Sequence, residues 1–355
     1  IPGPGDQVTV NHNVTLRCGT HALDSVTVNA GKTVTFETWN ACLNATNATV
    51  NGILTHPVQN ATSPDPVSGE WVPDNRVWIV CSNLTVAAGG AISVNGKGWN
   101  PGCGPGRGGG DRGGGGHGGA GGIGYSGRNA LGIDYHGTWG RWGPLYGYGL
   151  TFGNPLAPTE PGCGDDKVNS TKSGGGAVRI EASGRVTVNG AIRSRGLDAH
   201  GGVYGGGSGG SIYITCATFD GSGCLDASGG LSAGSESGGG GGGRIAVDYH
   251  DLETQATLAP TVEFFLGGRQ GRPLGYTAGE HGTLYLPTTS FYPRAVMGGG
   301  GTLVIPGFTS WRTDRLILTN SALEFPEGFS LKVDGDLVIS NKAELVIRNG
   351  EVRCG

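Results

Sequence analysis

The stretch GGGAVRIEASGRVTVNGAIRSRG, residues 174–196, decides the fold, because the chain repeats its pattern 34 residues later as SGGSIYITCATFDGSGCLDASGG, residues 208–230. In both copies glycines precede a short apolar run, a second short run follows, and the unit closes on glycine. A third start, GGRIAV at 242–247, follows about 33 residues further on. Self-similarity at a fixed period of this size is the signature of a fold built from stacked repeats.

Short apolar runs, some of which alternate valine with threonine, extend this pattern to both ends of the chain. Val8–Val10 and Val26–Val28 are examples near the start, and Leu337–Ile339 is one near the end. No capped stretch with helical periodicity stands out. Strands this short bury a face only when successive coils stack. The sequence therefore predicts an all-β fold, a right-handed parallel β-helix or β-solenoid, with a β-sandwich or a propeller as the alternative.

The repeat also defines the expected organisation of the chain. Residues 84–98, LTVAAGGAISVNGKG, resemble residues 185–196, RVTVNGAIRSRG, and the segment between them reads as an insertion. We expect one β-solenoid domain over residues 1–355. It would consist of N-terminal glycosylated coils at 1–98, a glycine- and aromatic-rich insertion at 99–173, and repeat and C-terminal coils at 174–355.

Glycine is unusually abundant, with 74 of 355 residues. Its tracts could be flexible linkers, or they could pack against backbone where a Cβ would clash. The tracts at 174–176, 205–210 and 238–243 each precede a repeated strand at similar phase, which favours close packing. For residues 104–122 the sequence does not decide between the two. Collagen is excluded, since the glycines lack a strict three-residue period.

Charge and hydropathy exclude two kinds of partner. The formal net charge is −4, with 24 basic and 28 acidic residues, so the clustered cations that phosphate binding needs are missing and nucleic acid is not expected. No apolar run is long enough to span a membrane. We expect neither a membrane span nor a cofactor.

The cysteines point to an oxidising compartment. Eight cysteines occur, an even number, and none has the spacing of a zinc site. Pairing of Cys103 with Cys163, Cys216 with Cys224, and Cys18 with Cys42 is suggested by context, although many connectivities are open. The predicted disulfide residues are Cys18, Cys42, Cys81, Cys103, Cys163, Cys216, Cys224 and Cys354.

Six Asn-x-Ser/Thr sequons accompany the cysteines, and five of them lie in the first 85 residues. Together they predict a secreted, N-glycosylated protein whose N-terminal region faces solvent. The acceptor residues are Asn13, Asn44, Asn47, Asn60, Asn83 and Asn169.

The insertion gathers most of the candidate chemistry. Aromatic residues are clustered there, and they could pack over glycine backbone or expose rings to a sugar or a protein partner. The candidate stacking residues are Trp139, Trp142, Tyr146 and Tyr148. For a polysaccharide lyase, which needs a base and a cation near the target carbon, the best cluster is Tyr135, His136 and Arg141. No spacing ties these groups together and no metal site is expected, so the sequence favours a structural role for them over a catalytic one and leaves enzyme activity open.

The segments GGGAVRIEASGRVTVNG, GGGSGGSIYITCATFDGSG and GGGGGGRIAVDYH, within 174–250, resemble a glycine-rich repeat of large secreted surface proteins. Such repeats occur in bacterial surface proteins and in extracellular proteins of algae and protists, including components of flagellar hairs, the mastigonemes. The resemblance implies an extracellular structural role and supplies no catalytic residues.

The ends of the chain carry strand patterns without a polar cap, from about residue 7 and up to Cys354. Uncapped coils template pairing with another chain. We therefore expect a structural glycoprotein at the cell surface, a building block of a filament, flagellar hair or surface layer. Its partners would be copies of itself or neighbouring modules. The alternatives are a lyase-like β-helix enzyme and a carbohydrate-binding adhesin.

Overall fold

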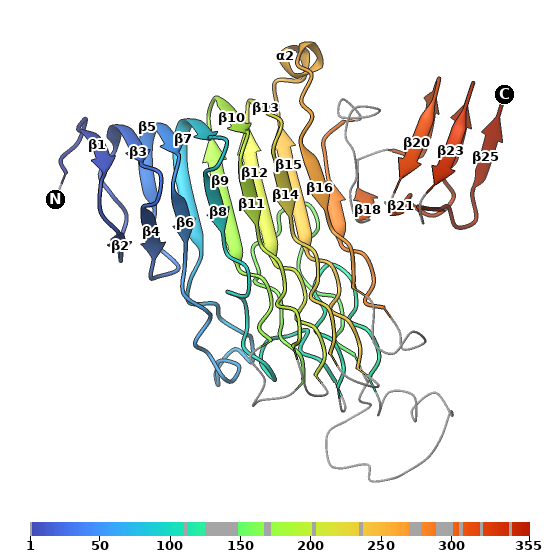
Figure 1. The fold of residues 1–355 in the computed structure, drawn as a ribbon, viewed down its shortest axis with the longest axis horizontal. Coiled ribbons are helices and arrows are strands. Elements are labelled where there is room, and N and C mark those ends of the chain that lie inside the picture. Colours follow the sequence, from blue (N-terminus) through green and yellow to red (C-terminus); the bar gives the residue numbers. More distant parts are fainter. Residues whose placement is uncertain are drawn as a thin grey trace, which may run out of the picture.

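In the computed structural model, parallel strands stack side by side along the long axis of the molecule, with the N-terminus at one end and the C-terminus at the other (Figure 1). The structure describes residues 2–109, 112–124, 148–166, 172–200, 204–233, 237–269, 278–288, 301–304, 308–319, 322–340 and 343–355. Within them the chain is all β apart from α2 (Leu252–Thr257).

Two parallel sheets run through the body of the molecule. We call them sheet A and sheet B. In stacking order, sheet A contains β1 (Gln7–Val10), β3 (Leu23–Val28), β5 (Leu43–Val50), β7 (Val77–Val86), β9 (Ala177–Ala182), β12 (Ser211–Cys216), β15 (Arg244–Tyr249), β17 (Thr283–Tyr285), β18 (Gly301–Val304), β21 (Ala322–Glu324) and β24 (Glu344–Val346), with β10 (Arg185–Val188) and β13 (Thr218–Asp220) beside this path. Sheet B contains β2 (Val14–Leu16), β4 (Thr33–Phe36), β6 (Ile53–Thr55), β8 (Ala91–Ser93), β11 (Ala191–Arg193), β14 (Cys224–Asp226) and β16 (Glu263–Phe265).

The C-terminal coils add two smaller parallel sheets. One contains β19 (Ser310–Thr313), β22 (Ser330–Val333) and β25 (Glu351–Cys354), and the other contains β20 (Leu316–Thr319) and β23 (Leu337–Ser340). The pairing within all four sheets is parallel. This rules out the alternatives of a sandwich or a propeller, which are built from antiparallel sheets.

Strand register confirms the repeat read from the sequence. Val178 pairs with Ile212, an offset of 34 residues, and Ile212 pairs with Ile245, an offset of 33. Across the insertion, Leu84 pairs with Val186, so the two similar segments lie in neighbouring coils. The repeat in the sequence is thus the stacking period of the fold.

The core consists of columns of apolar side chains, and each successive strand of a sheet contributes one side chain to a column. Since successive residues of a strand face opposite sides, each strand sends every second residue inward. One column is formed by Val10, Val28, Val50, Val86 and Val188, and another by Val14, Val34, Leu54, Ile92, Ile192, Leu225 and Phe264. From Leu54 to Phe264 the second column is fully buried.

The glycine tracts form a third, strandless part of the stack, and the longer connections extend from one edge of the sheets (Figure 1). Successive N–H groups in residues 206–210 donate in turn to three different neighbouring segments, and the order then repeats. A period of three is that of the polyproline II helix, which has no internal hydrogen bonds. The bonds run from Gly206 to Gly238, Gly207 to Leu197, Ser208 to Cys163, Gly209 to Gly241 and Gly210 to Ser194.

Glycine is required here because there is no room for side chains. A Cβ added at Gly209 would overlap the carbonyl oxygen of Ala227, and one added at Gly206 would overlap that of Gly230. The close-packing interpretation of the tracts at 174–176, 205–210 and 238–243 is therefore confirmed. The undecided tract joins the same lattice, since Gly115 N–H donates to Gly206 and Gly241 N–H donates to Gly115.

This packing predicts that a single methyl group added to a glycine of the lattice destabilises the protein strongly. We expect Gly209→Ala to lower the free energy of unfolding by about 3 kcal/mol or more, because backbone must move and lattice hydrogen bonds break. Chemical denaturation measures it. Gly19→Ala is the control, since the nearest atom to its added Cβ lies 3.9 Å away. Equal stability of the two variants would contradict the lattice.

Candidate assembly interface

Most of the residues proposed for chemistry lie outside the described residues. These are the lyase candidates Tyr135, His136 and Arg141 and the stacking candidates Trp139, Trp142 and Tyr146. Tyr148 is described and is partly exposed. In the described part of the chain, no group of His, Cys, Asp and Glu side chains could hold a metal ion. Within the same residues, no helix has the length and apolarity to cross a membrane.

The structure places the eight cysteines in different surroundings. All eight are free thiols in the structure. Cys216 is buried in sheet A, and Cys224 is partly exposed on sheet B beside the buried Leu225, so the pairing suggested for these two cysteines stays a prediction. Cys103 and Cys163 share a small core cluster with Trp99, and their pairing also stays a prediction.

Two cysteines differ from the others in accessibility. Cys18 and Cys354 are exposed, one in the first coil and one in the last strand. Among the buried thiols, burial raises the pKa of Cys81 to about 12 and that of Cys216 to about 12, which keeps both protonated and unreactive at neutral pH.

The sequon asparagines lie on the outer surface where the structure describes them. Asn13, Asn47, Asn60 and Asn83 are exposed and Asn44 is partly exposed, while Asn169 lies outside the described residues. Asn47 and Asn83 are neighbours in register, and the Asn83 amide donates to Asn47 Oδ1 at 3.1 Å. These positions are sterically open to modification, and their glycosylation stays a prediction.

Two buried histidines link segments that lie far apart in the sequence. His56 is buried, its Nδ1 donates to the Pro57 carbonyl at 2.6 Å, and its Nε2 accepts from the N–H of Ala177 at 3.1 Å. His117 is fully buried, and its Nδ1 donates to the carbonyl of Gly209 at 3.0 Å. Burial lowers the pKa of His56 to about 4 and that of His117 to about 3. Both are neutral packing groups at physiological pH.

The N-terminal end of the stack is open. Among the described residues, β1 and β2 each have a strand partner on one side only. Val14 begins a core column and is 37% exposed, whereas its in-register neighbour Val34 is 3% exposed. Leu16 is likewise partly exposed, while its neighbour Phe36 is fully buried. The first coil thus presents the inward-facing side chains of the core without a coil to cover them.

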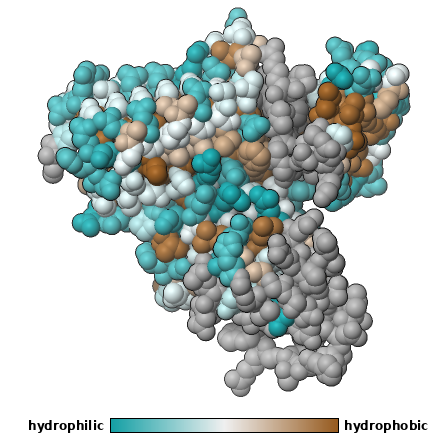
Figure 2. All heavy atoms as spheres, viewed as in Figure 1, coloured by the Kyte–Doolittle hydropathy of each residue, from teal (hydrophilic) through white to brown (hydrophobic). Residues whose placement is uncertain are grey.

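The C-terminal end is open in the same way. Val352 follows the fully buried Leu331 in its column and is 43% exposed, and Ile339 follows the buried Leu318 and is 46% exposed. Figure 2 shows apolar residues gathered on this C-terminal part of the surface. Among the described residues, the core columns therefore end in exposed apolar side chains at both ends of the stack.

Comparison with known proteins adds no relative: no family model, curated protein or solved structure matches the chain.

The buried histidines predict acid lability. The unfolded chain takes up a proton at His56 below about pH 6.5, while the folded chain resists it until about pH 4. The contribution of neutral His56 to the free energy of unfolding is therefore fully present above about pH 6.5. The free energy of unfolding falls by ~3 kcal/mol as the pH drops to about 4. Protonation would set an N–H of His56 against the N–H of Ala177.

Chemical denaturation between pH 7.5 and pH 4 measures this loss. We expect His56→Gln to be less stable than the natural chain at neutral pH and to lose less stability on acidification. The exposed His12 supplies the control, as His12→Gln should keep the full pH dependence. An unchanged pH dependence in His56→Gln would show that His56 does not carry it.

Proposed function

We propose that this protein is a structural building block of an extracellular filament or surface layer, in which copies stack end to end. The first coil of one copy would cover the last coil of the next. Core columns that end in exposed side chains at both ends are the observation that carries the proposal. Head-to-tail contacts of this kind do not close on themselves, so they lead to filaments.

The gain from such a contact is that of adding one more coil. Parallel strand edges would pair as they do between coils within the molecule. Each valine, leucine or isoleucine at the end of a column would become buried, which stabilises by about 1.5–3 kcal/mol per fully covered side chain. Several such residues at each end, together with two or more strand edges, supply a driving force for association.

We infer further that the coils form a right-handed β-helix. The chain passes repeatedly from sheet A to sheet B and back to a parallel neighbour in sheet A, and parallel crossover connections are right-handed in nearly all proteins. The resemblance to glycine-rich surface proteins, the sequons and the even number of cysteines support a secreted glycoprotein at the cell surface.

Electron microscopy and sedimentation of the purified protein test the stacking. We expect filaments whose formation increases with protein concentration. In Val352→Asp a carboxylate would sit at the end of a core column, and burying it unpaired is costly, so filaments should be lost.

Arg353→Asp is the matched control, because it places the same carboxylate one residue along β25, and it should still assemble. In the natural chain, Arg353 forms an ion pair with Glu351 on the same strand, and its Nη2 lies 2.8 Å from Glu351 Oε2. Monomers at every concentration of the natural chain, or filaments of Val352→Asp equal to those of the natural chain, would refute end-to-end stacking.

A further inference from the structure

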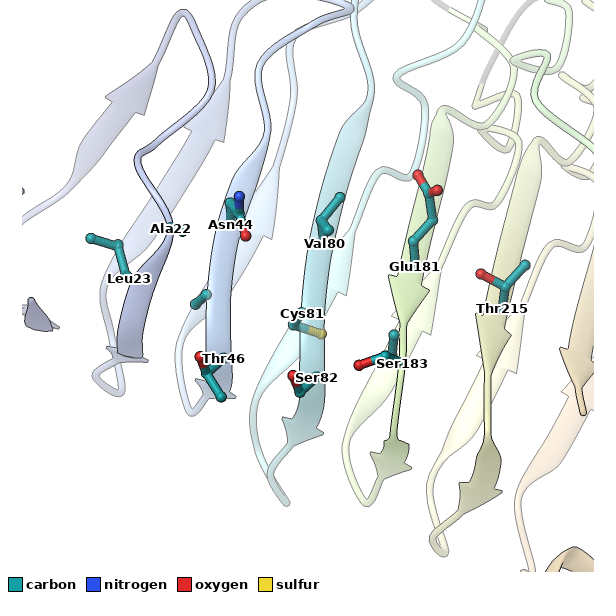
Figure 3. Close-up of a pocket in the computed structure, with 12 residues that line it drawn as sticks. Ala22, Leu23, Asn44, Thr46, Val80, Cys81, Ser82, Glu181, Ser183 and Thr215 are labelled. Carbon is teal, nitrogen blue, oxygen red and sulfur yellow. The ribbon is translucent and has the colours of Figure 1, made fainter. Parts of the chain in front are cut away.

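An open groove of about 450 Å³ crosses sheet A where its strands bend (Figure 3). It runs across β3, β5, β7, β9 and β12, parallel to the stacking direction. One wall carries Asn44, Val80, Glu181 and Thr215, which are neighbours in register, the other carries Thr46, Ser82 and Ser183, and small residues, Ala45, Cys81 and Ala182, lie between the walls.

The groove exists because the strands break their alternation at this point. In β5 both Thr46 and Asn47 face solvent. In the coil that contains β9, a turn after Ala182 separates β9 from β10. Side chains on either side of the bend therefore diverge. Ala45, Cys81 and Ala182, between the walls, are buried in the core, so their side chains do not fill the space between the walls.

Asn44 lies in this groove and begins the sequon Asn44-Ala45-Thr46. Its backbone is fixed, since its N–H donates to Thr20 Oγ1 at 2.9 Å. Its side chain is partly exposed, and among the described residues its amide has no hydrogen-bond partner. The Asn83 amide, by contrast, donates to Asn47. Asn44 is thus an acceptor whose amide is available at the wall of a preformed groove.

We propose that an N-linked glycan on Asn44 lies along this groove instead of extending into solvent. The inference rests on the proposed secreted glycoprotein. From Asn44 the groove crosses three strand intervals to Thr215, about 14 Å, which is the reach of a few sugar units. An oligosaccharide on this path meets a hydroxyl or a carboxylate on every coil.

The walls offer the chemistry that recognises a neutral sugar chain. The hydroxyls of Ser82, Ser183 and Thr215 can donate to and accept from sugar hydroxyls. Glu181 is held in place through Oε1, which accepts a hydrogen bond from Trp78 Nε1 at 2.6 Å and forms an ion pair with Arg179, whose Nε lies 2.8 Å away. Its second carboxylate oxygen can then accept from the glycan. Val80 supplies an apolar surface for the faces of sugar rings.

Protection from enzymatic release tests the proposal on the full chain secreted from eukaryotic cells. The folded glycoprotein is treated with peptide N-glycosidase, and release at each site is followed by mass spectrometry. We expect the Asn44 glycan to be released about tenfold more slowly than the glycan on the exposed Asn60, because only the undocked glycan is accessible. After denaturation the two rates should be equal.

A pair of variants tests the groove itself. Ser183→Tyr fills one wall with a bulky side chain, and release at Asn44 should approach the rate at Asn60. Thr187→Tyr is the control, since Thr187 faces outward from β10 beyond the groove, and it should keep the protection. An unmodified Asn44, or release at Asn44 as fast as at Asn60, would overturn the proposal.

The outcome is separable from that of the proposed function. Asn44→Gln removes the glycan without touching the ends of the stack, so it should form filaments like the natural chain. Filaments without protection at Asn44 would overturn the glycan proposal alone, and a protected glycan on a protein that never assembles would overturn end-to-end stacking alone.

Discussion

The structure depends on hydrogen bonding of each coil to the next by its own backbone. In the sheets this takes the ordinary form of parallel ladders between strands only three to ten residues long. In the glycine region the same requirement is met without strands, as each segment turns its N–H groups toward three neighbours in succession. Since buried backbone groups must be paired, this lattice lets chain without strand structure run through the interior.

This lattice requires residues without side chains. Ordering a glycine costs about 0.5–1 kcal/mol relative to alanine, and a backbone hydrogen bond contributes a similar net amount. The lattice is therefore stable as a whole and intolerant of any added Cβ. The described tract at 112–122 belongs to the same lattice, because it pairs with segments of two successive repeats.

The sequence predicted the features that repeat and missed those that depend on contacts between distant segments. The 34-residue offset placed Val178 beside Ile212, and the phase of the glycine tracts indicated packing before the lattice could be seen. The tract at 104–122 has no repeat phase, so nothing local revealed its partners. His56 accepts a hydrogen bond from Ala177, 121 residues away, and no sequence motif predicts such a bond. Glu181 and Thr215 are unremarkable in sequence, and only register brings them into line with the sequon at Asn44.

The surface chemistry bears on the direction of growth in the proposed filament. The interior columns end at the two terminal coils, so association along the stacking direction continues contacts that the molecule already makes between its own coils. Asn47 and Asn83 are exposed on the outer face of sheet A, and glycans there would project sideways and hinder contact between flat faces. A glycan at Asn44 that lies within its groove would cover the bend of the same sheet while leaving the ends free. Glycans at Asn47 and Asn83 on the face of sheet A, together with apolar columns at the ends, would thus favour growth in one dimension over lateral aggregation.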